Sequence, residues 1–471
     1  MSGAGANAPG TYSSGADSQG TYGSGANPSG TKASGAYGSG AYGEPRLPLP
    51  DLDTTLPNGL RVVLCSAPVV PLVEIRLTVP YAATGPGEVA LRQLLAGILL
   101  QGTTHRDADA FDTALATHGA ALDAGADARR FTVTGHTLAD SLPAVLALLA
   151  ETVLGPRLTE DVVAPERTRL ARRIELSSHQ PAAVAQQALL RRRYGEEFAA
   201  RLRPAPQLAA ACTPEDLGEL HARQLGADGA VLVLVGDLRP DDALAAVGEA
   251  FGAWHRGEAD DVPQQPPFLG GPPLWVDRPG AVQSMIRLAT PALPRTDPGY
   301  PALHLAQLVF GGSFASRLVA HLREEKGYAY QLGSGMESVP GASTLMIEAD
   351  TAAEHTVAAL AVIRDELARM AAEPPSEREV DAARSYAIGS IATAMSSPAS
   401  LASGLSNLLH IGVGTDWLHG WGSLLNGVTY EAVTDAARRF FRPTAFTGVV
   451  LADESAVAPL RRDGTGAELD F

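Results

Sequence analysis

The feature that most constrains the fold of this 471-residue chain is a pattern of strands and helices that occurs twice. Each copy begins with a segment in which apolar and polar residues alternate, at 72–79 and at 283–290. A period of two is typical of a strand with one buried face. Each of these segments is followed by a loop with Pro and Gly and then by a helical stretch. The pattern therefore indicates two similar units, each with its own sheet.

The later parts of the two units also correspond. In the first, a strand at 131–134 leads into the helix SLPAVLALLAETV, and another helix starts after Thr159. In the second, a strand at 344–347 leads into TVAALAVIRDEL, and another helix starts after Ser376. Ser and Thr at such starts are suited to cap helix N-termini. The closing segments, CTPEDLGELHARQLGADGAVLVLVGD and VTYEAVTDAARRFFRPTAFTGVVLAD, each contain a Thr-capped helix and an apolar strand. This correspondence favours an internal duplication.

The duplication predicts an α+β fold in which one unit is used twice. We expect two homologous α/β-roll domains, each an antiparallel-rich mixed sheet with helices packed on one face. A ten-residue repeat rich in Gly, Ser and Ala precedes them, and such a composition predicts a disordered tail. The predicted division is a tail at 1–44, a domain at 50–256, a Pro- and Gly-rich linker at 257–272, a domain at 273–456 and a tail at 457–471.

Composition limits the classes of function. Hydrophobic residues make up 45% of the chain and charged residues 19%, as is typical of soluble globular proteins. The net charge of −16 argues against nucleic acid as a partner. Neither a long apolar stretch nor a secretory signal is apparent, so we expect no membrane partner and a cytoplasmic location. Cys65 and Cys212 lie far apart, which suggests neither a disulfide framework nor a thiolate metal site.

The strongest local motif is GGSFASRLVAHLREEKGYAY at 311–330. It predicts a corner at which a helix ends and a strand begins, with a guanidinium at Arg323 and a phenol at Tyr330. Both groups can donate hydrogen bonds to a peptide carbonyl or to a developing oxyanion. The ordinary alternative is that Arg323 is a solvated helix residue and Tyr330 a simple strand aromatic. The residues alone leave both interpretations open.

The segments GGSFASRL and LREEKGYAY, with the earlier NGLRVVL and QGT, resemble the pitrilysin/insulinase family of zinc peptidases. The resemblance extends over nearly all of residues 55–455, and the duplicated halves are also a feature of that family. Active members carry H-x-x-E-H on a helix shortly before a Q/K-G-T turn. In that motif two His bind zinc and the Glu activates a zinc-bound water.

In this chain the corresponding positions, counted back from QGT, are Gln93, Ala96 and Gly97. None of these side chains can replace an imidazole ligand or accept a proton from water. The resemblance places the third ligand of the family, a Glu, near PERTRLARRIEL. That segment offers Arg172 and Arg173, with Glu175 displaced in register.

The missing motif does not depend on the alignment. No two of the 11 histidines are three or four residues apart. We therefore predict that the chain holds no metal and no cofactor of its own.

The resemblance implies a role in a two-component enzyme. In such enzymes one subunit carries zinc and the other carries the Arg/Tyr pair, around a shared chamber. This chain is then expected to be the non-catalytic subunit of a heterodimer, with zinc in a homologous partner subunit and an extended peptide as substrate. Arg323 and Tyr330 are expected to act in the partner's site. Removal of a leader peptide and general peptide clearance are both compatible with this role.

Two alternatives come from other classes. The chain could be a purely structural or peptide-binding relative without a proteolytic role, in which Arg323 and Tyr330 are remnants. It could also be an enzyme with a different nucleophile in the same chamber. No phosphate-binding loop, G-x-S-x-G or H-E-x-x-H motif supports the second alternative.

Overall fold

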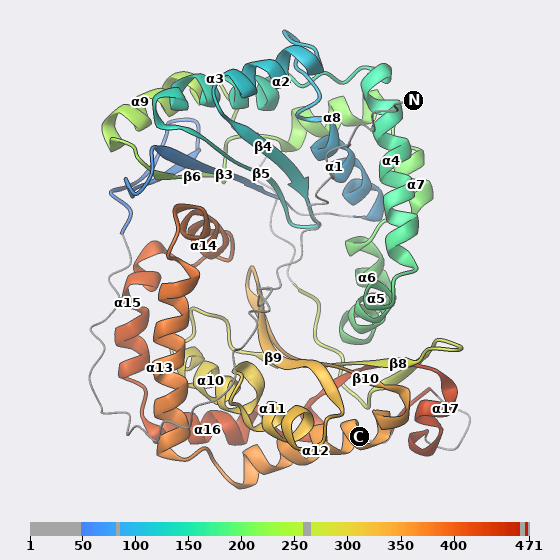
Figure 1. Ribbon diagram of the computed structural model, residues 1–471. Helices are drawn as coiled ribbons and strands as arrows, with labels where there is room; N and C mark the ends of the chain where they lie inside the picture. The colour runs from blue at the N-terminus through green and yellow to red at the C-terminus, as the bar shows by residue number, and fades with distance from the viewer. Residues whose placement is uncertain (1–48, 82–84, 258–264, 462–466, 470–471) are drawn as a thin grey trace, which may run out of the picture. The chain divides into compact units, whose positions relative to one another are not determined.

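The computed structural model describes residues 49–81, 85–257, 265–461 and 467–469. The predicted tail at 1–44 lies outside the described residues, as do parts of the predicted linker and of the C-terminal tail. The division of the chain into domains stays a prediction. The described elements form two sheets, one from the first half of the chain and one from the second (Figure 1).

The first sheet is mixed and has the strand order β1-β2-β6-β3-β5-β4. Strands β2 and β6 run parallel, and the other neighbours run antiparallel. In β3, the alternation expected from the sequence places Val73, Ile75 and Leu77 in the core. The strands are β1 (Leu52–Thr55), β2 (Arg61–Ser66), β3 (Leu72–Pro80), β4 (Ala121–Ala126), β5 (Arg130–Leu138) and β6 (Val231–Gly236).

The helices of this half include three that cover one face of the sheet. Helices α1, α3 and α9 contribute to the core beneath them, which also contains Phe251 and Trp254. Thr213 caps α8 in a reciprocal pair with Asp216, as the sequence predicts. The helices are α1 (Pro86–Ile98), α2 (Ala108–Thr117), α3 (Leu142–Leu154), α4 (Glu160–Ser178), α5 (Pro181–Tyr194), α6 (Glu196–Leu202), α7 (Pro206–Ala210), α8 (Pro214–Gln224) and α9 (Pro240–Phe251).

The second sheet repeats this plan with the order β7-β11-β8-β10-β9. Strands β7 and β11 are parallel, and the remaining neighbours are antiparallel. Ser376 and Glu379 form a capping box at the start of α13, in agreement with the predicted helix start. The strands are β7 (Leu274–Asp277), β8 (Gln283–Ala292), β9 (Ala329–Val339), β10 (Ala342–Ala352) and β11 (Thr447–Ala452).

The helices of the second half follow the same order as those of the first. Two segments have the wider π-helical turn, Leu308–Gly312 and Ala320–Glu325, and they flank the short helix α11. The predicted α+β fold with two antiparallel-rich mixed sheets is confirmed. The helices are α10 (Tyr300–Gln307), α11 (Arg317–Val319), α12 (Thr356–Ala372), α13 (Glu377–Ala394), α14 (Pro398–His410), α15 (Thr415–Asn426), α16 (Tyr430–Phe440) and α17 (Glu454–Val457).

The two halves exchange a helix. Helix α14 of the second half packs on β3 and β6 of the first sheet, where Leu405 belongs to an apolar cluster with Val63 and Val233 (Figure 1). Helix α5 of the first half packs on β8 and β11 of the second sheet, where Leu189 meets Val449. Helix α5 directly follows the long helix α4 in the chain, and α14 directly follows the long helix α13. The two exchanged helices therefore hold equivalent places in the two halves. The face of each sheet opposite its own helices is thus covered by the other half.

Two arginines, one half-buried and one buried, add polar contacts to this exchange. Arg76 on β3 donates to Ser403 Oγ on α14 at 3.0 Å. Arg193 on α5 is 2% exposed and donates to Glu337 on β9 at 2.7 Å. The planar guanidinium group needs several hydrogen-bond acceptors in fixed positions. The contacts of Arg76 and Arg193 therefore restrict the orientation of α14 and α5. Both contacts join parts of the chain more than 100 residues apart.

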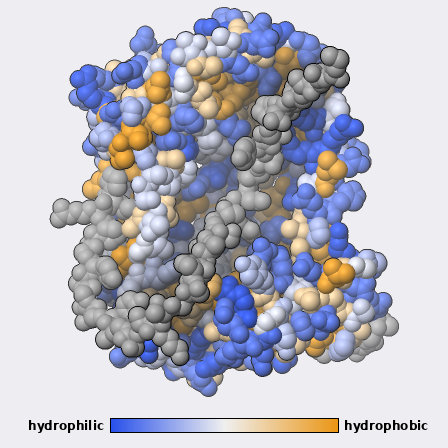
Figure 2. Space-filling model, viewed as in Figure 1, coloured by the Kyte–Doolittle hydropathy of each residue, from blue (hydrophilic) through white to orange (hydrophobic). Residues whose placement is uncertain are grey.

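The surface is mainly polar on the face shown in Figure 2, where hydrophobic residues form small separate patches. Within the described ranges, no helix combines the length and the apolar character that crossing a membrane would require.

The environment of His304 predicts that the fold loses stability in mild acid. The His304 ring packs against Tyr300 and Trp421, and burial lowers its pKa to about 4, with a further contribution from Arg295. In the unfolded chain, His304 takes up a proton as the pH falls below the ordinary histidine pKa of 6.5. In the folded chain it does so only near pH 4. Folding stability should therefore fall as the pH drops from 6.5 to 4.

The measurement is urea unfolding at pH 7 and pH 5. Between these two pH values the free energy of unfolding should fall by about 2 kcal/mol less in His304→Phe than in the wild type. The matched control is His105→Phe, at an exposed position. An equal loss in the wild type and in His304→Phe would contradict the assignment.

Candidate functional site

The positions of the missing zinc motif lie together on α1. Ala96 is buried in the core and Gln93 and Gly97 are half-buried. Helix α1 packs against α4, the helix in which the third zinc ligand was sought. The helix pair on which the resemblance places a zinc site is therefore present, and Gln93, Ala96 and Gly97 supply no zinc ligand.

Glu166 on α4 occupies the space beside Gly97. A Cβ atom at position 97 would lie 2.7 Å from Glu166 Oε1 and 2.9 Å from its Cγ. The Glu166 side chain is only 4% exposed. The absence of a side chain at Gly97 thus lets a carboxylate pack directly on the backbone of α1. Glu166 was not among the positions predicted from the sequence, which were Arg172, Arg173 and Glu175.

Two arginines neutralise this carboxylate. Arg169 forms an ion pair with Glu166 from the next turn of α4, and Arg173 Nη2 lies 3.6 Å from Glu166 Oε1. Burial raises the pKa of Glu166, while Arg169 and Arg173 act in the opposite direction. Arg172 and Glu175 point to the exposed side of the helix. The available signal was a glutamate with arginines three and seven residues later, which places all three side chains on one face of the helix.

These residues do not fit a zinc ion. Zinc sites need three or four His, Cys or carboxylate ligands around one point, and Gln93, Ala96 and Gly97 supply none. No cluster of three such side chains with metal-binding geometry occurs in the part of the chain that the structure describes. A further guanidinium, that of Arg92, is buried one turn before Ala96, 3.7 Å from the centre of the Tyr81 ring.

The contact at Gly97 generates a stability prediction. Gly97→Ala should destabilise the chain by about 1–3 kcal/mol, because the new methyl group overlaps Glu166 and neither helix can shift freely. The matched control is Gly389→Ala in α13, where a Cβ meets no atom within 4 Å. That control should stabilise the chain by about 0.5–1 kcal/mol, since Ala is the better helix former. Thermal unfolding of the two variants would measure this, and shifts of the same sign would refute the packing argument.

The second candidate surface surrounds the predicted Arg/Tyr pair. The predicted corner is confirmed, since a π-helical turn ends at Glu325 and β9 begins at Ala329. Between them Gly327 adopts a φ of 65°, which other residues rarely tolerate. The register between β9 and β10 shifts between Ala349 and Thr351, so β9 contains one extra residue at Tyr330 and Gln331.

This bulge explains why Tyr330 is accessible. A bulge interrupts the strict alternation of a strand and can redirect a side chain. Tyr330 is 84% exposed, and Gln331 beside it is exposed as well. The phenol therefore projects from the edge strand of the second sheet and is available to a ligand.

Arg323 is held in place by its neighbours. Its guanidinium lies 4.0 Å from the centre of the Phe314 ring, and its Nε donates to Glu324 at 2.9 Å. Its Nη2 is buried and has no acceptor among the described residues. In the part of the chain that the structure describes, no hydrogen bond joins Arg323 to Tyr330. Sequence analysis missed Phe314, whose aromatic ring among small residues was the available signal.

Two partly buried side-chain contacts hold the segment that leads to Arg323. His321 Nδ1 lies 2.6 Å from Glu366 Oε1 on α12. Arg317 binds both oxygens of Glu379 on α13, at 2.7 and 2.9 Å. Hydrogen bonding from Arg317 is the main reason that the pKa of Glu379 falls to about 2. Helix α11 is thereby tied to α13, and the π-helical segment after it to α12.

Comparison with known proteins shows which families and relatives the chain is similar to. Residues 92–204 match the insulinase family, peptidase family M16, and residues 211–386 match the peptidase M16 inactive domain. An uncharacterized zinc protease of Mycobacterium leprae is 26% identical over 344 residues, covering 72% of this chain and 77% of the relative. A probable inactive metalloprotease of Bacillus subtilis is 24% identical over 249 residues, covering 50% of this chain and 56% of the relative.

Solved structures share the fold. A peptidase M16 inactive domain from Pseudomonas fluorescens has a TM-score of 0.78 at 24% identity, covering 85% of this chain and 97% of that one. A protease from Helicobacter pylori has a TM-score of 0.76 at 18% identity, covering 86% and 100%. The two family matches together span more than half of the chain, and they show that it belongs to the insulinase, or M16, peptidase family.

Proposed function

We propose that this chain is the non-catalytic subunit of a heterodimeric zinc peptidase and contributes Arg323 and Tyr330 to the site of a zinc-bearing partner. The observation that carries the proposal is the contrast between its two candidate surfaces. The zinc-motif positions are closed by a carboxylate paired with arginines, whereas Tyr330 is exposed and Arg323 has a donor without an acceptor.

In the proposed complex the two side chains bind the substrate rather than the metal. The zinc of the partner would supply the activated water. Tyr330 donates its O–H, and Arg323 its N–H groups, to the carbonyl of an extended peptide. Both donors would also stabilise the negative charge that develops on that oxygen. Phe314 and Glu324 limit the movement of the guanidinium before the peptide arrives.

The names of the relatives agree with the coarse part of this proposal. One relative is called a zinc protease and another a probable inactive metalloprotease. The heterodimer, the peptide substrate and a role in leader-peptide removal are finer proposals of our own.

The isolated chain should bind no stoichiometric zinc. Glu166 is already paired with Arg169 and Arg173, so a cation at this place would be repelled. The measurement is the metal content of purified full-length chain after incubation with zinc and exhaustive dialysis. Retention of one zinc per chain would contradict the proposed assignment.

Variants at the Arg/Tyr pair should reduce turnover without preventing assembly. A homologous partner that carries H-x-x-E-H is co-purified with the chain, and cleavage of a peptide substrate is followed. Tyr330→Phe and Arg323→Ala should each lower kcat by roughly 100- to 1000-fold, which is the typical effect of losing one oxyanion donor. The matched controls are Tyr386→Phe and Arg364→Ala, and these should leave turnover unchanged.

The alternative function is a purely structural or peptide-binding role. The closed zinc-motif positions favour it as much as they favour the heterodimer. Under this alternative, the complex with Tyr330→Phe or Arg323→Ala would assemble and turn over at the wild-type rate. That result would refute the catalytic contribution while leaving family membership untouched.

A further inference from the structure

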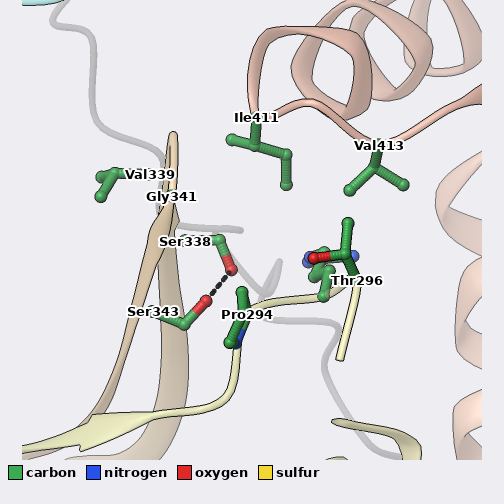
Figure 3. A pocket seen from close by; sticks show the side chains of 9 residues that line it. Pro294, Thr296, Ser338, Val339, Gly341, Ser343, Ile411 and Val413 are labelled. Atoms are coloured by element: carbon green, nitrogen blue, oxygen red, sulfur yellow. Dashed lines mark hydrogen bonds between the residues drawn. The ribbon is translucent and has the colours of Figure 1, made fainter. Parts of the chain in front are cut away.

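A small pocket lies in the second half, apart from the two candidate surfaces. Three segments form it: the loop after β8, the hairpin between β9 and β10, and the loop between α14 and α15 (Figure 3). Its volume is about 190 Å³. Sites for drug-sized molecules are larger, at roughly 300–1,000 Å³. This pocket therefore suits a small molecule or the end of a longer chain.

The polar side of the pocket contains an arginine without a carboxylate. Arg295 lines the pocket, and its Nε is buried without a hydrogen-bond acceptor. No ion pair to Arg295 occurs among the described residues. Its guanidinium lies 5.7 Å from the centre of the Tyr300 ring and 5.3 Å from that of Trp417. Such contacts use the face of the guanidinium, whereas its N–H groups donate in the plane and still need acceptors.

Hydroxyl groups complete the polar side. Ser338 and Ser343 lie opposite each other in the hairpin, and their hydroxyls are 3.2 Å apart (Figure 3). Two hydroxyls have two protons and use one of them between themselves, so one proton remains for a ligand. Thr296 adds a third hydroxyl to the lining. The group that matches a guanidinium and spare hydroxyl donors is an anion with several acceptor oxygens.

The other side of the pocket is apolar. Ile411 and Val413 come from the loop after α14, and Figure 3 shows their side chains directed toward Thr296 and Pro294. Two aliphatic side chains facing one cation favour an anion that carries an apolar group. These two side chains disfavour a hydrated inorganic ion, because contact with its bound water would leave their apolar surface hydrated and so add no binding free energy.

We propose that this pocket binds a carboxylate that carries a small aliphatic group, either a free acid or the C-terminal residue of a peptide. Arg295 and the serine hydroxyls hold the carboxylate, and Ile411 and Val413 contact the aliphatic part. The proposal does not depend on the proposed heterodimer, since all these residues belong to this chain.

The first experiment uses the full-length chain and two matched probes, N-acetyl-leucine and its amide, which lacks the carboxylate. Calorimetry should show saturable binding of the acid and binding of the amide that is about tenfold weaker or more, because a charge-assisted hydrogen bond is lost. Equal binding of acid and amide would overturn the proposal, as would no saturable binding of the acid. Tighter binding of inorganic phosphate than of the acid would overturn it as well.

Variants then locate the site. Arg295→Gln should weaken binding of the acid about tenfold or more, whereas Arg239→Gln, at an exposed arginine before α9, should leave it unchanged. If Arg295→Gln does not fold, the double variant Ser338→Ala with Ser343→Ala keeps the charge and should weaken binding about threefold or more. Wild-type affinity in a folded variant of either kind would refute the assignment.

A second pair of probes separates the two sources of the carboxylate. A pentapeptide that ends in leucine is compared with its C-terminally amidated form. Binding of only the free-acid peptide supports recognition of peptide C-termini, and binding of N-acetyl-leucine alone supports a free small acid. Equal binding of the acid and amidated peptides would overturn carboxylate recognition.

Discussion

The exchange of α5 and α14 is the interaction on which the rest of the structure depends. A mixed sheet has two faces, and the helices of its own half cover one of them. Each remaining face, which includes Val63 and Val233 in the first sheet and Met346 and Val449 in the second, would expose apolar residues to water. A helix from the other half covers it instead. The arginines Arg76 and Arg193 then fix the angle of these helices through specific acceptors. Neither half is therefore completed by its own residues.

At the positions of the zinc motif, ordinary side-chain contacts also join two helices. The zinc site that the resemblance implies for active members would join two helices through ligands from both. Here Glu166 contacts the backbone of α1 at Gly97, and two guanidinium groups provide the positive charge. The helix pair thus has neither an unpaired buried carboxylate nor an empty space beside Gly97, either of which would cost stability. The structure of the helix pair can persist without the chemistry that the pair supports elsewhere.

Sequence analysis predicted the fold well because its signals were local. The strands β3 and β8 and the caps at Thr213 and Ser376 depend on residues close together in the chain, and all four appear in the structure. Burial alternates in the first part of β3, whereas in β8 residues 286–290 are all buried. The exchanged helices could not be predicted in this way, because nothing within α14 indicates which sheet it will cover. Glu166 and Phe314 were missed for a related reason, since their partners are brought close only by folding. The bulge at Tyr330 depends on the register of two strands, which periodicity does not determine.

That bulge has a consequence beyond the accessibility of one phenol. Strand β9 is an edge strand, and a regular edge can pair with the same strand of another copy and start aggregation. The extra residue interrupts the row of backbone donors and acceptors, so a second chain could not remain in register past Gln331. The irregularity that presents a side chain for recognition also limits self-association through the backbone. Straightening the strand would thus affect solubility as well as any ligand.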